Sequence, residues 1–229
     1  LPLDVVSYII ELCTLPTLSR FAATSVIADK LVARELDIRR VHILAPFIKD
    51  QDTFRNKLTV LNSVLSGSAA LSLCTARDAF QPKDLDIYVP ANTAEVWVRY
   101  LTAEEGYRVL RRVNTVDEHD MQYPRYHGGI GPIVTLTRDT TTIDIVESNT
   151  VCATLPIPFF WTTTAMSFVT GTGIVTLFPH LLEEHRGLLN PERKADFALD
   201  PSLGEAQNEQ DQLEMLLTKY RSRGFDIRD

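Results

Sequence analysis

Alternating apolar and polar positions predict short β-strands in the middle of the chain. In residues 84–89, leucine, isoleucine and valine alternate with aspartates and a tyrosine. Residues 133–137 and 141–146 are rich in β-branched side chains, and the three residues between them suit a tight turn. Because β-branched runs separated by a short turn are typical of two strands joined in a hairpin, we expect a β-hairpin here. Residues 107–116 have the same composition and predict a further strand.

Apolar residues at helical spacing predict helices on both sides of these strands. The ranges that show this spacing are 53–63, 69–77, 94–105, 162–169, 178–186 and 210–221, besides two stretches within residues 1–40. Polar runs at 117–132 and 187–208 indicate loops. The order of elements predicts an α+β fold, in which helices flank a mixed β-sheet, with a helical segment at the N-terminus and a helical C-terminal part.

Three aspartates occupy matching places in the predicted strands. Asp84 and Asp86 are two residues apart and therefore point to the same face of one strand, with Leu85 facing the core. Asp144 lies between two isoleucines on a second strand. If the strands are neighbours, the three carboxylates meet, and they repel one another unless a cation neutralises them. Carboxylate oxygens suit Mg²⁺, which completes its shell with phosphate and water.

A small-residue turn precedes the aspartates: Gly67-Ser68 follows the apolar Val64-Leu65 and opens a predicted helix. The combination of this turn, Asp84-Leu85-Asp86 and Asp144 resembles the nucleotidyltransferase superfamily, the fold shared by DNA polymerase beta and many smaller enzymes. The resemblance covers roughly residues 55–185. The fifteen residues between Ser68 and Asp84 are at the long end of that family's spacing.

The resemblance implies a catalytic and metal-binding role for each of the three aspartates. Asp84 and Asp86 would hold Mg²⁺ or Mn²⁺ ions that carry the triphosphate of an NTP substrate. Asp144 would contact the catalytic metal and help to deprotonate the acceptor hydroxyl. Gly67 would let the backbone approach the phosphates, and Ser68 would supply a hydroxyl at a helix N-terminus, an end that favours anions. The plainer interpretation is that Ser68 caps a helix and that the aspartates are solvated strand ends.

Other residues carry weaker signals. Lys83 either contacts a phosphate or is an exposed lysine at the start of a strand. The run 162–164 and Met166 either line a pocket for acceptor or base, or begin a helix. The aromatic side chains within 123–127 are candidates for stacking on a base. Strand alternation places Glu147 on the face opposite Asp144, which excludes it from the site.

Residues 1–40 form a separate helical pattern. Leu1-Pro2, spaced isoleucines and leucines, a break at Pro16 and a second apolar stretch together resemble an F-box, whose family docks on a Skp1-like adaptor. The chain departs from that family at Asp29-Lys30, where a basic residue and tryptophan are common. The alternative is a helical hairpin packed on the main domain. We therefore expect an F-box-like segment over 1–45 and a nucleotidyltransferase-like domain over 46–229.

Composition and charge restrict the partners. The 229 residues are 45% hydrophobic and carry a net charge of −7, which does not favour bulk nucleic acid, whose binding needs a basic face. The arginines at 39–40, 108–112 and 221–223 suggest solvated faces. Three widely spaced cysteines argue against a zinc site or disulfide framework and favour an intracellular, reducing location. No apolar run is long enough for a membrane span, so we expect no membrane partner. Because the chain begins at Leu1, we expect it to be a trimmed piece.

Two classes of function follow. The leading hypothesis is a Mg²⁺-dependent nucleotidyltransferase that transfers a nucleotidyl group from an NTP, such as ATP, to an acceptor the sequence does not name. The alternative is a non-catalytic F-box-type adaptor, whose nucleotidyltransferase-like domain recruits a target or senses a nucleotide.

Overall fold

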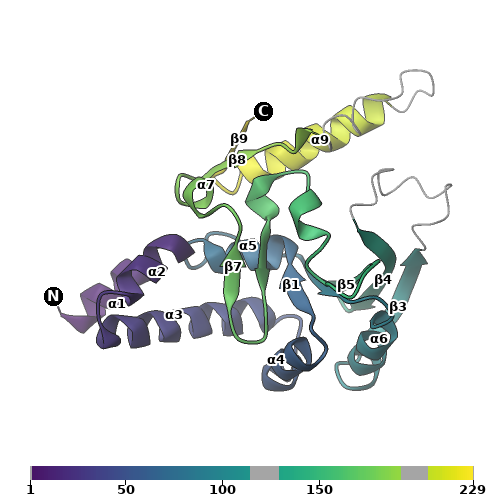
Figure 1. Ribbon diagram of the computed structural model, residues 1–229, viewed down its shortest axis with the longest axis horizontal. Coiled ribbons are helices and arrows are strands. Elements are labelled where there is room, and N and C mark those ends of the chain that lie inside the picture. The colour runs from purple at the N-terminus through teal and green to yellow at the C-terminus, as the bar shows by residue number, and fades with distance from the viewer. Residues whose placement is uncertain (1, 114–128, 192–205, 229) are drawn as a thin grey trace.

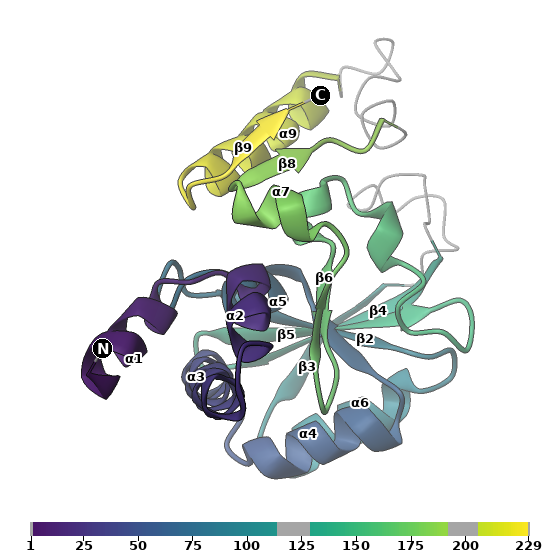
Figure 2. The same cartoon turned by 60° about the vertical axis from the view of Figure 1, so that its left-hand side comes forward.

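The computed structural model describes residues 2–113, 129–191 and 206–228, with the backbone alone for 206–212. A seven-stranded sheet crosses the middle of the molecule in the order β3-β4-β5-β2-β1-β6-β7 (Figures 1 and 2). Among the described strands of this sheet, β2 and β5 are the one parallel pair, and the other neighbours are antiparallel. The strands are β1 (Val64–Ser66), β2 (Asp84–Val89), β3 (Arg108–Val113), β4 (Ile130–Arg138), β5 (Thr141–Ser148), β6 (Ser167–Val169) and β7 (Ile174–Thr176). The mixed α+β architecture expected from the sequence is confirmed.

The described residues also form eight α-helices. They are α1 (Leu3–Glu11), α2 (Leu15–Ala22), α3 (Val26–Leu44), α4 (Gln51–Val60), α5 (Gly67–Cys74), α6 (Ala94–Ala103), α7 (Pro179–Glu183) and α9 (Ala206–Arg221). The hairpin expected around residues 138–140 is present as β4 and β5. No helix in these ranges is both long enough and apolar enough to cross a membrane.

One face of the sheet carries the main core. Leu85 and Ile87 of β2 and their neighbours Ile143 and Ile145 of β5 are fully buried there. They pack against the end of α3 and against α4, α5 and α6, where Trp97 is the largest buried side chain. Because strand side chains alternate between faces, the same register turns Asp84, Asp86 and Asp144 to the opposite face. The main core therefore fixes the direction in which the aspartates point.

The first three helices form a lobe that extends from the sheet (Figure 1). Its small core contains Ile10, Leu18 and Val32. The buried Arg39 joins the lobe to the rest of the chain: it donates to Glu35, to three backbone carbonyls around residues 10–13 and to the carbonyl of Thr75, just after α5. The interpretation of Arg39 as part of a solvated face is wrong, because its side chain is 1% exposed and satisfies backbone acceptors.

The helix expected over 162–169 is also wrong. Residues 163–165 form one turn of 3-10 helix, and β6 begins at Ser167 and pairs with β1 through Leu65 and Val169. The pairing with β1 extends the sheet and forms the strand. The helix expected over 178–186 is reduced to α7. The loop expected over 117–132 lies mainly outside the described residues, and β4 begins at Ile130.

A C-terminal unit completes the fold. Strands β8 (Arg186–Leu188) and β9 (Asp226–Arg228) pair in parallel, and α9 lies next to them at the top of Figure 1. Tyr220 and Phe225 pack with Leu71 and Cys74 of α5. The amphipathic helix expected over 210–221 is thus present, and its last turn is held against the helix that follows the Gly67-Ser68 turn.

Candidate functional site

The turn between β1 and α5 places backbone directly against an aspartate. Gly67 opens α5 with a φ of +63°, a conformation that favours glycine. A Cβ at this position would overlap the carboxylate of Asp86. The Oγ of Ser68 donates to the Oδ1 of Asp84 at 3.1 Å. Ser68 is therefore not the cap of α5; the capping position is Ser66, whose side chain bonds the carbonyl of Ser167 instead.

Strand register places the polar residues in one row across the sheet. Asp86 of β2 is opposite Ser66 of β1 on one side and Asp144 of β5 on the other. Asp144 is in turn opposite Thr135 of β4, whose hydroxyl donates to its Oδ1 at 2.6 Å. Asp84 lies two residues before Asp86, on the same face. The structure therefore brings the predicted aspartates to one face of adjacent strands, beside Gly67 and Ser68.

These carboxylates influence one another electrostatically. Burial, followed by the charges of Asp84 and Asp144, raises the pKa of Asp86 to about 8, although Lys219 opposes the shift. Burial and the charge of Asp84 also raise the pKa of Asp144, and the hydrogen bond from Thr135 offsets part of this. All three side chains are partly buried, which contradicts the interpretation of these aspartates as solvated strand ends. A cation at this face would relieve the repulsion.

The arrangement is not that of a ready-made metal centre. Within the described ranges, no group of three or more His, Cys, Asp or Glu side chains is placed to hold a metal ion. Two of the carboxylates instead have an oxygen engaged by a hydroxyl, Asp84 by Ser68 and Asp144 by Thr135. The three aspartates thus share a face, with hydroxyl groups as their present partners.

The C-terminal helix adds residues that the sequence analysis missed. Tyr220 is buried, and its ring stands 5.1 Å from that of Trp161, edge to face. Burial raises the pKa of the Tyr220 phenol to about 12; the charge of Arg223 opposes the shift, and those of Asp86 and Asp84 add to it. Lys219, the preceding residue, acts on Asp86. The sequence shows Lys219 near the C-terminus, but no local pattern relates it to Asp86 in β2, more than 130 residues earlier.

The structure also shows where several of the weaker candidate residues from the sequence lie. Lys83 is exposed, as expected for a lysine at the start of a strand. Thr162 caps the short 3-10 helix through the backbone N–H of Thr164, and Met166 is buried in a second core cluster. Glu147 accepts from the backbone N–H of Ala94 at 2.9 Å, which confirms its place on the other face. The aromatic residues within 123–127 lie outside the described residues.

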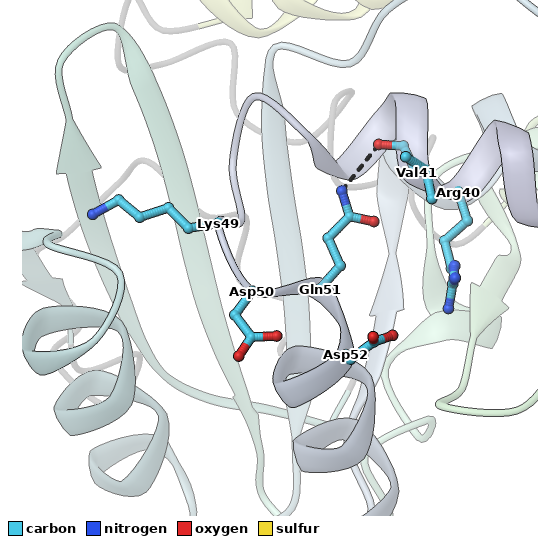
Figure 3. Close-up of a pocket in the computed structure, with 6 residues that line it drawn as sticks. All are labelled: Arg40, Val41, Lys49, Asp50, Gln51 and Asp52. Carbon is cyan, nitrogen blue, oxygen red and sulfur yellow. Dashed lines mark hydrogen bonds between the residues drawn. The ribbon is translucent and has the colours of Figure 1, made fainter.

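Two hollows in the surface are lined by other residues. Figure 3 shows the first, of about 370 Å³, between the end of α3 and the start of α4. Gln51 donates there to the carbonyl of Val41, and Lys49 points away from Arg40. The second, of about 320 Å³, also includes Arg40 and extends to the β6–β7 turn. Asp84, Asp86 and Asp144 line neither hollow, so both hollows are separate from the carboxylate site.

Comparison with known proteins adds no assignment: no family model, curated protein or solved structure matches this chain.

Proposed function

We propose that this protein is a Mg²⁺-dependent nucleotidyltransferase that transfers a nucleotidyl group from an NTP to an acceptor. One observation carries the proposal: Asp86 and Asp144 are directly opposite each other on parallel neighbouring strands, and the Gly67 turn packs against Asp86. Phosphoryl and nucleotidyl transfer depend mainly on positioning and on neutralising negative charge. A row of carboxylates would hold the divalent cation that neutralises this charge, and the neighbouring helix N-terminus would help to position the phosphates.

The residues present fit a bound divalent cation in their chemistry. Asp86 is held partly buried beside two like charges, and an ion such as Mg²⁺ or Mn²⁺ would favour its ionised form. Asp84 and Asp144 would contribute oxygens on either side of it. Ser68 and Thr135, which now bond these two carboxylates, would orient them as ligands. When bound, the metal would supply neutralisation of the triphosphate and activation of the attacking oxygen.

The other residues position the site and the substrate. Gly67, lacking a Cβ, lets the carboxylate of Asp86 lie directly against the start of α5. The first turn of α5 presents backbone N–H groups, whose partial positive charge favours an anion. Asp144 would accept a proton from the acceptor hydroxyl, a role supported by its position opposite Asp86, on the side away from this turn.

The test measures the binding of each of the four NTPs in the presence of Mg²⁺, Mn²⁺ or chelator, by thermal shift and by calorimetry. We expect binding only when nucleotide and divalent cation are present together, and its loss in Asp86→Ala. Asp139→Asn is the matched control, because Asp139 is exposed at the tip of the β4–β5 hairpin and asparagine tolerates its φ of +52°. Equal affinity with and without chelator would contradict the proposal.

The exposed apolar residues of α1 favour adaptor binding as a second candidate function. Leu3 and Tyr8 of α1, and Leu12 directly after its last residue, are between 59% and 65% exposed, and Ile9 is 46% exposed. Leu18, by contrast, is 1% exposed in the core of the lobe. Exposed apolar side chains grouped on one helix are typical of a protein interface. A pull-down with a purified Skp1-like adaptor tests this, with Leu12→Ser expected to weaken capture.

A further inference from the structure

The row of polar residues across the sheet continues to its edge strand. Asp144 of β5 is opposite Thr135 of β4, and Thr135 is opposite Arg111 of β3. Residues directly opposite each other on neighbouring strands project from the same face of a sheet. Arg111 therefore stands on the carboxylate face, which we define as the face that carries Asp84, Asp86 and Asp144. Strands β3, β4 and β5 lie at the right of Figure 1.

A second row of residues runs beside the first. Asp84 is opposite Thr142 of β5, and Thr142 is opposite Thr137 of β4. Thr137 is in turn opposite Arg108, the first residue of β3, whose side chain is exposed. Two arginines of one edge strand thus lie at the ends of two neighbouring rows, and each row contains an aspartate of the site.

A β-bulge allows both arginines to share this face. Residues 108 and 111 are three positions apart, so in a regular strand they would point to opposite faces. The register shifts between Val109 and Arg111, where one extra residue of β3 interrupts the alternation. Tyr107, directly before Arg108, is buried in the main core, whereas Val113, two positions after Arg111, is buried in the cluster on the other face. Burial on both sides of the bulge therefore agrees with the register.

The neighbouring Arg112 faces the helices instead. It is opposite Val134, a residue of the main core, and its guanidinium pairs with Glu95 of α6. A carboxylate on that side of the sheet therefore offsets its charge. Arg108 and Arg111 place their charges on the carboxylate face, so three arginines that are close in sequence serve two different faces.

We propose that Arg108 and Arg111 bind a phosphate group of the acceptor, and that the acceptor is a small phosphorylated molecule with a free hydroxyl. This inference rests on the function proposed above, which it extends by naming the class of acceptor. Asp144 is the residue proposed to take the hydroxyl proton, and β3 lies two strands beyond it, away from the Gly67 turn. Neighbouring strands are about 4.8 Å apart, so the backbone of β3 is about 10 Å from that of Asp144. An acceptor with its hydroxyl at Asp144 would cross β4 and reach the arginines with its phosphate.

The charges of this region favour a phosphate over a single negative charge. A phosphate monoester carries a charge of about −1.5 to −2 at pH 7, which two guanidinium groups match, and their planar donors fit its oxygens. The chain carries a net charge of −7, so a dianion that approaches the aspartates is repelled unless local cations offset the repulsion. In the transfer, the acceptor oxygen bonds to the α-phosphorus of the NTP and its proton passes to Asp144. The bond from that phosphorus to the bridging oxygen breaks, and pyrophosphate leaves with the electron pair.

The first experiment measures the Kd of inorganic phosphate and of ribose 5-phosphate by calorimetry, with ribose as the uncharged probe. The variants are Arg108→Gln and Arg111→Gln. Arg112→Gln is the matched control, because it removes the same charge from the same strand on the other face. We expect Arg108→Gln and Arg111→Gln each to weaken both phosphates about tenfold or more, since hydrogen bonds between charged groups are the strong ones. Arg112→Gln should stay within about twofold of the parent, and ribose should bind more weakly than ribose 5-phosphate.

The Kd of Mg²⁺–NTP separates an acceptor site from a nucleotide site. We expect Arg108→Gln and Arg111→Gln to bind Mg²⁺–NTP within about twofold of the parent, and saturating ribose 5-phosphate to leave that Kd unchanged. Competition between the two ligands, or a loss of NTP affinity equal to the loss of phosphate affinity, would overturn the acceptor role. A short oligoribonucleotide that binds more tightly than ribose 5-phosphate through both arginines would overturn the assignment of a small molecule.

Failure of this inference can be told apart from failure of the proposed function. If Asp86→Ala abolishes NTP binding while neither phosphate depends on Arg108 or Arg111, the inference is overturned and the proposed function stands. If the parent binds no NTP but binds ribose 5-phosphate through both arginines, the proposed function and the acceptor role are overturned and the anion site stands. Absence of phosphate binding, or equal weakening in Arg112→Gln, refutes the inference. Arg108 is exposed, so Arg108→Gln should keep the Tm of the parent and provides the test even if Arg111→Gln unfolds.

Discussion

Replacing Asp86 by asparagine should stabilise the protein in the absence of divalent cations. The carboxyl of Asp86 has a pKa of about 8 in the folded protein, because of burial and of the charges of Asp84 and Asp144. In the unfolded chain the pKa returns to its ordinary value of 3.8. Folding near neutral pH therefore requires this carboxyl to take up a proton or to stay ionised next to two like charges. Asparagine has nearly the same shape and carries no charge.

The magnitude follows from the pKa difference. At pH 7, keeping the carboxyl protonated costs about 4 kcal/mol, at about 1.36 kcal/mol for each unit of pKa. Asp86 is partly exposed, so solvent screening reduces this cost, and the new amide has its own desolvation penalty of about 1 kcal/mol or more. We therefore expect a net gain of about 2 kcal/mol. For a chain of this size, that gain raises the Tm by about 4–8 °C.

The direction of this pKa shift determines how the difference in stability between Asp86→Asn and the parent changes with pH. Because the pKa is higher in the folded state, the folded protein binds a proton that the unfolded chain has released between about pH 4 and pH 8. The stability linked to this proton is complete below about pH 4 and is lost as the pH rises to about 8. The difference between Asp86→Asn and the parent should thus be near zero at pH 4 and largest at pH 8.

The assay is thermal unfolding in chelator from pH 4.5 to 8.5, with Asp139→Asn as the control for a neutralised aspartate outside the site. Adding Mg²⁺ should raise the Tm of the parent and leave the Tm of Asp86→Asn unchanged, so the difference in Tm between the two proteins should become smaller. A Tm for Asp86→Asn equal to or below that of the parent across this range would refute the reasoning.

Three further predictions concern the turn, the lobe and its junction with the sheet. Gly67→Ala should abolish Mg²⁺–NTP binding in calorimetry and lower the Tm, because the added methyl overlaps Asp86 and the φ is unfavourable; normal binding would contradict this. Arg39→Met should reduce the free energy of unfolding in urea by about 3–5 kcal/mol, because it leaves buried carbonyls unpaired and leaves Arg77 as the remaining described cation bonded to the buried Glu35; a loss under 1 kcal/mol would be the opposing result. Leu18→Ala should cost about 2–4 kcal/mol in the same assay, whereas the exposed Leu12→Ser should stay within about 0.5 kcal/mol.

The carboxylate row was predictable because its signal is local. Asp84 and Asp86 alternate with Leu85 within one strand, and Asp144 repeats the pattern between two isoleucines. Alternation alone determines which side chains share a face. What the sequence left open was whether β2 and β5 are neighbours, and this depends on the order of strands in the sheet.

The remaining features depend on contacts between distant segments. Residues 167–169 form a strand because β1 offers an open edge, which no property of this short stretch reveals. Arg39 is buried because carbonyls of two separate segments converge on it, although its sequence neighbours suggest an exposed face. Tyr220, near the end of the chain, is buried because it packs on α5, a helix much earlier in the sequence. Composition and periodicity carry no information about such pairings.

The position of α5 bears on how the two candidate functions can be separated. Its N-terminus is the Gly67-Ser68 turn beside the aspartates, and the carbonyl of Thr75, just after its last residue, is bound by Arg39. Removing residues 1–40 would therefore delete Arg39 and disturb the helix that forms the site. A loss of nucleotide binding in such a truncation would not show that the lobe takes part in binding. Substitution of exposed residues such as Leu12, which leaves Arg39 in place, isolates partner binding from the integrity of the site.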